Sequence, residues 1–95
     1  MKAAKIVLVE DNANDVELTL AALDDHRLAN EMVVLRDGAQ ALDYFFRRGQ
    51  WAERGDGEPL LVLLDLKMPR VDGLEVLREL KADARLRPVP VVVLT

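Results

Sequence analysis

A run of five apolar residues places the strongest constraint on how this chain can fold. Residues 60–64 are all leucine or valine, and they are bounded by Pro59 and Asp65. An uninterrupted apolar strand is typical of a parallel sheet covered by helices on both faces. A strand in a sheet with one solvent-exposed face would instead alternate apolar and polar residues. Ligands of such open sheets bind outside the carboxyl ends of the strands. Asp65, which follows the run, is therefore a candidate functional residue.

Three more apolar runs predict strands over residues 5–9, 32–35 and 91–94. Segments of helical character separate them, so strand and helix alternate along the 95 residues. This alternation predicts a single α/β domain in which right-handed crossovers build a parallel sheet covered on both faces. Residues 49–58, rich in glycine and charge, are expected to form a surface loop that Trp51 anchors by packing.

Capping residues and apolar spacing predict three helices. The first is expected from about residue 14 to about residue 25, because Asn14 and Glu17 resemble a capping box. The second is expected after residues 37–38 and the third after residues 72–73, where Asp-Gly pairs stand. The expected apolar stripes of the three helices are Val16, Leu20 and Leu23; Ala41, Leu42, Phe45 and Phe46; and Leu74, Leu77, Leu80 and Ala84.

Carboxylates follow the first predicted strand as well as the third. Glu10 and Asp11 stand at the carboxyl end of the first strand. If the chain reverses its direction of winding after the first crossover, a crevice opens between strands one and three, and Glu10, Asp11 and Asp65 converge there. Three carboxylates so close repel one another unless a cation neutralises them, and oxygen-only ligands fit Mg²⁺ or Mn²⁺. The pattern indicates phosphoryl chemistry in which Asp65 attacks phosphorus.

The amino-acid composition argues against nucleic acid and membranes as binding partners. Acidic residues outnumber basic ones by 17 to 13, the net charge is -4, and the basic residues are scattered, so no nucleic-acid surface is expected. Cysteine is absent, which excludes disulfides and thiolate metal sites and suits the cytoplasm. The apolar runs are too short to span a membrane, so no membrane association is expected.

Taken together, the motifs resemble the receiver domain of two-component response regulators. The matching segments are Val9-Glu10-Asp11-Asn12, Asp37-Gly38 with Ala41-Leu42, Asp65-Leu66-Lys67-Met68-Pro69 through Asp72-Gly73, and Pro90-Val91-Val92-Val93-Leu94-Thr95. They occur in the family's order across nearly the whole sequence. The chain is also similar to stand-alone receivers that partner phytochrome-type sensor kinases, which share Asn14-Asp15, a long connection after the second helix and a Leu-Arg approach to the fourth strand, here at residues 86–87.

The resemblance implies a flavodoxin-like, doubly wound parallel sheet with strand order 2-1-3-4. It implies that Asp65 accepts a phosphoryl group from a histidine kinase or a small phosphodonor, in a receiver that assists its own phosphorylation and dephosphorylation but is not a classical enzyme. Asp11 and Asp65 would ligate Mg²⁺ directly, Glu10 would act through a bound water, and the backbone carbonyl of Lys67 would complete the protein ligands. Thr95 would hydrogen-bond the phosphoryl group and shift on activation, so that the signal passes through protein contacts.

One departure from the family concerns the end of the sequence. A whole receiver continues past the fourth strand with a helix, a fifth strand whose start carries a lysine that pairs with the phosphoryl group, and a fifth helix. Residues 1–95 are therefore expected to be a receiver domain that is incomplete at its C-terminal end. Lys67 neighbours the acceptor and does not take that lysine's role. A fourth strand at the edge would expose apolar side chains, so we expect either that the natural chain is longer than these residues or that the protein associates with another copy, as a homodimer or a larger self-association.

Two alternative functions stay open at this point. A haloacid-dehalogenase-like phosphatase also uses an Asp at a strand end with Mg²⁺, but it places a second Asp two residues later, where this chain has Lys67. A receiver that works only as a docking module, without phosphorylation, is favoured by the missing lysine. The intact carboxylates Glu10, Asp11 and Asp65 oppose that second alternative.

Overall fold

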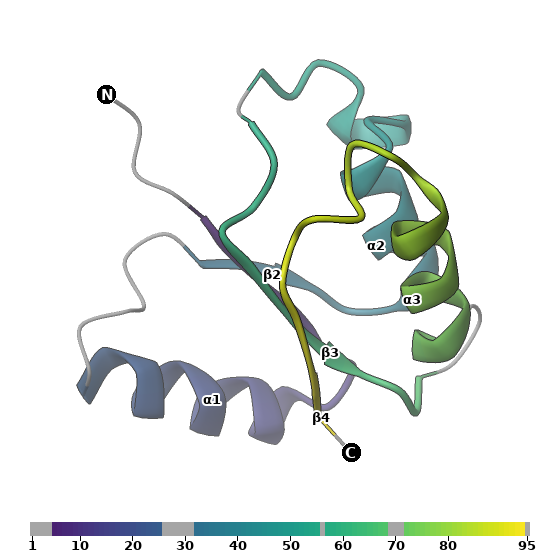
Figure 1. The fold of residues 1–95 in the computed structure, drawn as a ribbon. Helices are drawn as coiled ribbons and strands as arrows, with labels where there is room; N and C mark the ends of the chain where they lie inside the picture. The colour runs from purple at the N-terminus through teal and green to yellow at the C-terminus, as the bar shows by residue number, and fades with distance from the viewer. Residues whose placement is uncertain (1–4, 26–31, 56, 69–71, 95) are drawn as a thin grey trace.

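The computed structural model describes residues 5–25, 32–55, 57–68 and 72–94, and it contains one sheet with helices on both sides (Figure 1). The strands are β1 (Ile6–Val9), β2 (Met32–Leu35), β3 (Leu61–Asp65) and β4 (Val91–Leu94). The helices are α1 (Ala13–Asp25), α2 (Gly38–Phe45) and α3 (Gly73–Ala82), with a short 3-10 helix, η1, over Gly49–Trp51. None of the helices in these ranges is both long and apolar enough to cross a bilayer.

All four strands are parallel and lie in the order β2-β1-β3-β4. This order confirms the flavodoxin-like, doubly wound arrangement predicted from the sequence. Val9, the last residue of β1, pairs with Leu35 of β2 and with Leu64 of β3. Because β1 and β3 end side by side, the residues that follow Val9 lie next to Asp65.

Helix α1 covers one face of the sheet (Figure 1). The strand side chains on this face include Ile6, Leu8 and Leu63, which are buried against Val16 of α1. Leu20 and Leu23 pack on the same cluster, as the spacing predicts. The apolar stripe on α1 therefore holds the helix that follows β1 firmly against the sheet.

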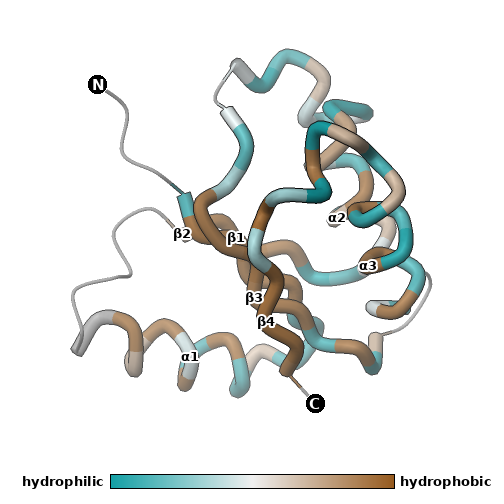
Figure 2. Tube along the Cα trace, in the orientation of Figure 1, coloured by the Kyte–Doolittle hydropathy of each residue, from teal (hydrophilic) through white to brown (hydrophobic). Residues whose placement is uncertain are grey.

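Helices α2 and α3 cover the opposite face, where the larger core lies (Figure 1). Val7, Val9, Val62 and Leu64 of the strands pack there with residues of both helices. The helix side chains of this core are Ala41, Tyr44, Phe45, Val76 and Leu80. Both faces of β1 and β3 are thus covered, which explains why these strands are almost uniformly apolar in sequence (Figure 2).

The ends and faces of several elements differ from those predicted. Helix α1 begins at Ala13 and is capped by Asn12, whose Oδ1 accepts from the Asp15 N–H at 3.0 Å, so the predicted cap at Asn14 is wrong. Strand β3 is shifted by one residue, because Leu60 is exposed outside it and Asp65 is its last residue. A strand pairs by its backbone, and a polar side chain at its end does not prevent pairing.

The predicted stripe of α3 is partly wrong as well. Val76 and Leu80 are buried, whereas Leu74 is exposed, because it lies off the face that meets the sheet. The helix ends at Ala82, before Ala84. Asp83 ends it by adopting an extended backbone while its Oδ1 accepts from the N–H groups of the following turn.

Strand β4 lies at one edge of the sheet and pairs with β3. Val92 and Val93 leave 47% and 40% of their surface exposed. The described sheet therefore has an apolar edge, as the sequence predicts, instead of a fourth strand buried on both faces.

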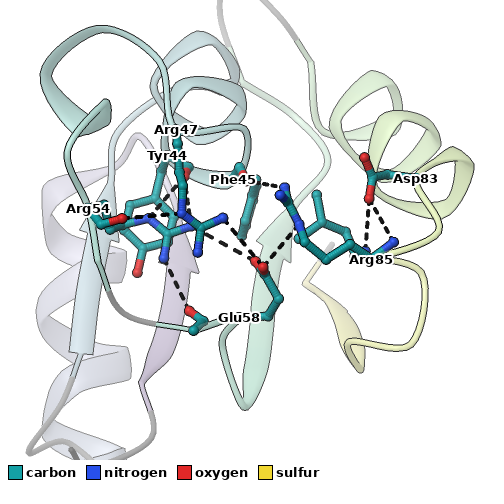
Figure 3. Close-up of polar contacts among 9 residues, drawn as sticks. Tyr44, Phe45, Arg47, Arg54, Glu58, Asp83 and Arg85 are labelled. Carbon is teal, nitrogen blue, oxygen red and sulfur yellow. Dashed lines mark hydrogen bonds and ion pairs between the residues drawn. The ribbon is translucent and has the colours of Figure 1, made fainter.

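The loop between α2 and β3 is held by aromatic packing and by arginines. The Trp51 ring contacts the Tyr44 ring edge to face at 5.0 Å, which agrees with the predicted anchoring role. The guanidinium carbon of Arg54 lies 4.0 Å from the centroid of the same Tyr44 ring, and the Arg54 guanidinium also donates to the Tyr44 carbonyl. Figure 3 shows Arg47, Arg54 and Arg85 around Glu58. The sequence patterns do not predict this cluster.

Candidate metal centre

The ends of β1 and β3 bring three carboxylates together. Glu10 and Asp11 follow β1 directly, and Asp65 is the last residue of β3. One oxygen from each of the three lies within 4.8 Å of the others. We call Glu10, Asp11 and Asp65 the acidic triad. Its position at the carboxyl edge of the sheet is the one that the strand pattern predicts.

Two members of the acidic triad are enclosed by protein. Glu10 and Asp65 expose only 6% and 8% of their surface, whereas Asp11 is half-buried. The Asn12 N–H donates to Glu10 Oε2 at 3.2 Å, and the Lys67 N–H donates to Asp65 Oδ1 at 3.0 Å. These bonds orient the two carboxylates, but each supplies only a dipole to a buried anion.

The pKa of Glu10 is raised above its ordinary value. Burial is the main cause, and the Asp65 carboxylate adds to the shift by charge repulsion. The hydrogen bond from the Asn12 N–H opposes the shift but does not cancel it. Burial and, to a smaller extent, the neighbouring carboxylate therefore disfavour the charged form of Glu10.

The donor set of the acidic triad fits a hard divalent cation. All three side chains offer carboxylate oxygens, and cysteine is absent from the chain. Such a cation would stabilise the charged form of Glu10 against the burial and the charge repulsion that together raise its pKa. Oxygen ligands from one or two carboxylates, completed by water and phosphate oxygens, are the coordination that Mg²⁺ usually takes in proteins.

The two other predicted site residues, Lys67 and Thr95, are not members of the acidic triad. Lys67 has an exposed side chain, and its N–H, not its ammonium group, is what contacts Asp65. A role for its carbonyl as a metal ligand stays a prediction. Thr95 lies outside the described residues, so its predicted role is untested.

Helix α3 begins very close to the end of β3. The Gly73 N–H donates to the Leu66 carbonyl at 3.1 Å. A Cβ atom on Gly73 would lie 2.2 Å from the backbone oxygen of Asp65. Asp72 caps the helix through a bond of 2.9 Å from the Glu75 N–H to its Oδ1. The Asp-Gly pair thus permits the close approach that fixes the backbone beside Asp65.

One residue near the acidic triad is missed by the sequence patterns. Arg36, directly after β2, donates from Nη2 to the backbone oxygen of Asp11 at 2.8 Å. The available signal is its position: it follows a strand that neighbours β1 in the predicted sheet. An isolated arginine after a strand is too common for sequence reasoning to single it out.

The parallel strand order and the carboxylates at the carboxyl edge define a flavodoxin-like α/β domain with a candidate cation site. A family model described as the response regulator receiver domain matches residues 6–95. The chain belongs to this family.

Comparison with individual proteins gives the same family. The chain is 40% identical over 90 residues to the response regulator Rcp1 of Synechocystis, a match that covers 95% of this chain and 60% of Rcp1. The bacteriophytochrome response regulator RtBRR superposes with a TM-score of 0.94 at 52% identity, covering 99% of this chain and 57% of that one. The chain thus spans about three fifths of the length of these relatives.

Two solved structures are informative about the site. The phosphorylated cyanobacterial phytochrome response regulator RcpA is 43% identical, with a TM-score of 0.86 and coverage of 97% of this chain and 64% of that one. The Mn²⁺-bound form of Rcp1 is 37% identical, also with a TM-score of 0.86, and the match covers 96% and 64% of the two chains.

Proposed function

We propose that this chain is a phosphoacceptor receiver in a two-component phosphorelay, with Asp65 as the acceptor. The observation that carries the proposal is the acidic triad, whose oxygens meet within 4.8 Å at the carboxyl edge of a receiver-family sheet. Glu10, Asp11 and Asp65 would hold Mg²⁺, with Mn²⁺ as a substitute and the Lys67 carbonyl as a further ligand. The Mn²⁺-bound form of Rcp1 supports this cofactor class.

The chain's own residues prepare Asp65 for the transfer. Hydrogen bonding along β3 fixes its backbone, and the Lys67 N–H holds Oδ1. In the proposed step a carboxylate oxygen of Asp65 bonds to phosphorus, the bond from phosphorus to the donor's histidine nitrogen breaks, and its electron pair stays on that nitrogen. The bound cation would offset charge on the phosphoryl oxygens. Thr95 would hydrogen-bond the product.

The proposed donor is a sensor histidine kinase of the phytochrome type. Support comes from the names of the relatives, since RtBRR and RcpA are phytochrome response regulators. The net charge of -4 gives no support to nucleic-acid binding, and the absence of cysteine supports our proposal that the protein works in the cytoplasm. We regard the chain as a signalling receiver and not a classical enzyme.

The test of this function is labelling with a small phosphodonor. Incubation with acetyl phosphate and Mg²⁺ should add one phosphoryl group, seen by intact-protein mass spectrometry, and EDTA should prevent the addition. Asp65→Asn keeps the shape of the side chain without the nucleophile and should abolish labelling while folding persists. Labelling of Asp65→Asn would move the acceptor elsewhere. Inertness of the folded full-length chain would support a docking receiver, and turnover of a phosphoester would support a phosphatase.

Self-association through β4 is a further part of the proposal. Among the described residues, Val92 and Val93 are exposed on a strand at the edge of the sheet, and apolar edges of this kind pair with other chains. Sedimentation equilibrium should show a mass that rises with concentration, and Val92→Lys should shift the equilibrium toward the monomer. A wild-type protein that stays monomeric at high concentration would contradict the proposed self-association but not the proposed phosphoacceptor role of Asp65.

A further inference from the structure

We propose that Arg36 is a positioning residue for the cation site, acting through the backbone of Asp11. The inference rests on the proposed function, because it assumes that the acidic triad binds a divalent cation. It adds a residue outside the triad and outside the family motifs quoted above. The Arg36 guanidinium contacts the Asp11 carbonyl.

The sheet brings Arg36 beside the loop after β1. Leu35, the last residue of β2, pairs with Val9 of β1, and the Glu10 N–H donates to the Leu35 carbonyl at 2.9 Å. Arg36 follows at once and donates from Nη2 to the Asp11 carbonyl at 2.8 Å. A guanidinium donor at this distance makes a charge-assisted hydrogen bond, which is stronger than one between neutral groups.

The hydrogen bonds of α1 do not hold the Asp11 carbonyl. The Asp15 N–H, which could have reached it, donates to the Asn12 side chain at 3.0 Å. The Val16 N–H donates to the Asn12 carbonyl, also at 3.0 Å. The Asp11 carbonyl therefore lies outside the hydrogen bonds of α1, and the bond from Arg36 orients it.

Arg36 is itself held in place by the start of α2. Its N–H donates to Gln40 Oε1 at 3.0 Å, and the Gln40 N–H donates to Asp37 Oδ1 at 2.8 Å. These contacts place both ends of Arg36 in a chain of hydrogen bonds from the α2 cap to the loop after β1. The first turn of α2 thus supports a ligand that lies on another element.

Two effects of Arg36 on cation binding oppose each other. Its positive charge repels a cation, while its hydrogen bond fixes the half-buried ligand Asp11. Arg36 is exposed, so water screens the repulsion. Glu10 and Asp65 are buried and bonded to backbone N–H groups, so Asp11 is the member of the acidic triad that most needs support from outside. The positioning effect should therefore outweigh the charge repulsion, so that Arg36 increases the affinity of the site for the cation.

Calorimetric titration of the purified protein with Mg²⁺ tests the proposal. Arg36→Met should weaken Mg²⁺ binding about tenfold, the lower end of the range for residues that orient metal ligands. Arg36→Lys keeps a donor and should recover part of the affinity. Gln40→Ala, which removes the support of Arg36 and keeps its charge, should weaken binding by a smaller factor. Urea unfolding with EDTA should show that the metal-free stability of Arg36→Met is close to that of the wild type.

The matched control is Arg78→Met, which removes an exposed positive charge from α3, on the far side of the sheet from α1. It should bind Mg²⁺ as the wild type does. If Arg36→Met behaves like Arg78→Met or binds Mg²⁺ more tightly, the positioning role is wrong and the proposed function stands. If the folded wild type does not bind Mg²⁺ at all, the proposed function itself fails.

Discussion

Glu10 combines the deepest burial in the acidic triad with a charged neighbour. It exposes 6% of its surface, and burial together with the Asp65 carboxylate raises its pKa above the ordinary value. At a pH between the ordinary pKa and the raised pKa, the folded state holds a proton that the unfolded state has already released, so deprotonation costs stability as pH rises. Without a cation, the charged form of Glu10 therefore destabilises the folded state at neutral pH.

We expect this to appear as a pH dependence of the metal-free protein. Between the ordinary pKa of a glutamate and the raised pKa of Glu10, the free energy of unfolding should fall as pH rises, because the folded state binds more protons there. Glu10→Gln should remove that part of the slope. Urea unfolding in EDTA over a pH series measures it, with Glu17→Gln on the exposed side of α1 as the control. Parallel pH profiles for the wild type and Glu10→Gln would contradict the assignment.

The residues of the site were predictable to different degrees. Glu10, Asp11 and Asp65 could be predicted because each follows a strand whose apolar pattern is readable in the sequence. Arg36 could not, because its function depends on which strand lies beside β1 and on a hydrogen bond to a backbone atom. Sequence patterns record side-chain types, and they carry no direct signal for contacts made by the backbone of a distant residue.

At the scale of elements, the junction of β3 and α3 is the tightest contact around the site. Gly73 begins α3 directly against the Asp65 and Leu66 backbone. A methyl group there would meet backbone atoms, which cannot rotate away as the end of a side chain can. Either α3 or the end of β3 would have to move.

Gly73→Ala should therefore destabilise the protein by at least about 2 kcal/mol, from the usual cost of overpacking. It should also weaken Mg²⁺ binding, since Asp65 lies at the same junction. Gly55→Ala is the matched control, because no atom lies within 4 Å of a Cβ there, and its stability should change by less than about 1 kcal/mol. Urea unfolding of both variants decides the question. Equal stability of the two would show that the junction is not as tight as described.

The limits of the elements were harder to predict than their existence. The cap of α1 falls on Asn12 although Asn14 carries the better sequence motif, because the Asp15 N–H is the group that needs a partner where the helix starts. The stripe of α3 includes Val76 and leaves Leu74 exposed, and only the direction in which the helix meets the sheet decides between them.

Across the whole molecule, Glu58 joins segments at the amino end of the sheet. Arg85 Nε lies 3.0 Å from Glu58 Oε2, and Arg47 Nη1 lies 3.4 Å from the same oxygen. Arg54, whose side chain is 5% exposed, is 4.0 Å from Oε1. Arg47 lies in the turn after α2, Arg54 in the loop that follows, and Arg85 in the segment between α3 and β4 (Figure 3). One carboxylate therefore links the connection between α2 and β3 with the connection between α3 and β4.

Glu58→Gln should lower the free energy of unfolding by about 1–3 kcal/mol, because it removes a mostly buried carboxylate that Arg47, Arg54 and Arg85 share. Asp43→Asn is the control. Asp43 pairs with Arg48 at 3.7 Å in an exposed position, and its loss should cost less than about 1 kcal/mol. Thermal or urea unfolding measures both. A Glu58→Gln protein as stable as Asp43→Asn would refute a structural role for the cluster.

The Glu58 cluster also shows where prediction from sequence ends. The alternation of strands and helices along the chain follows from local apolar patterns, whereas the strand order in the sheet is expected from the resemblance to the receiver family. The pairing of Glu58 with Arg85 joins residues that no local pattern relates, so only the folded chain reveals it.

We propose that Glu10, Asp11 and Asp65 surround one hard cation. Crystals of the protein grown with Mn²⁺, measured at a wavelength where manganese scatters anomalously, would show this arrangement. We predict one anomalous peak among the three carboxylates, and its loss in Asp65→Asn. Ordered crystals whose carboxylates hold no peak, or whose manganese lies elsewhere, would contradict the account.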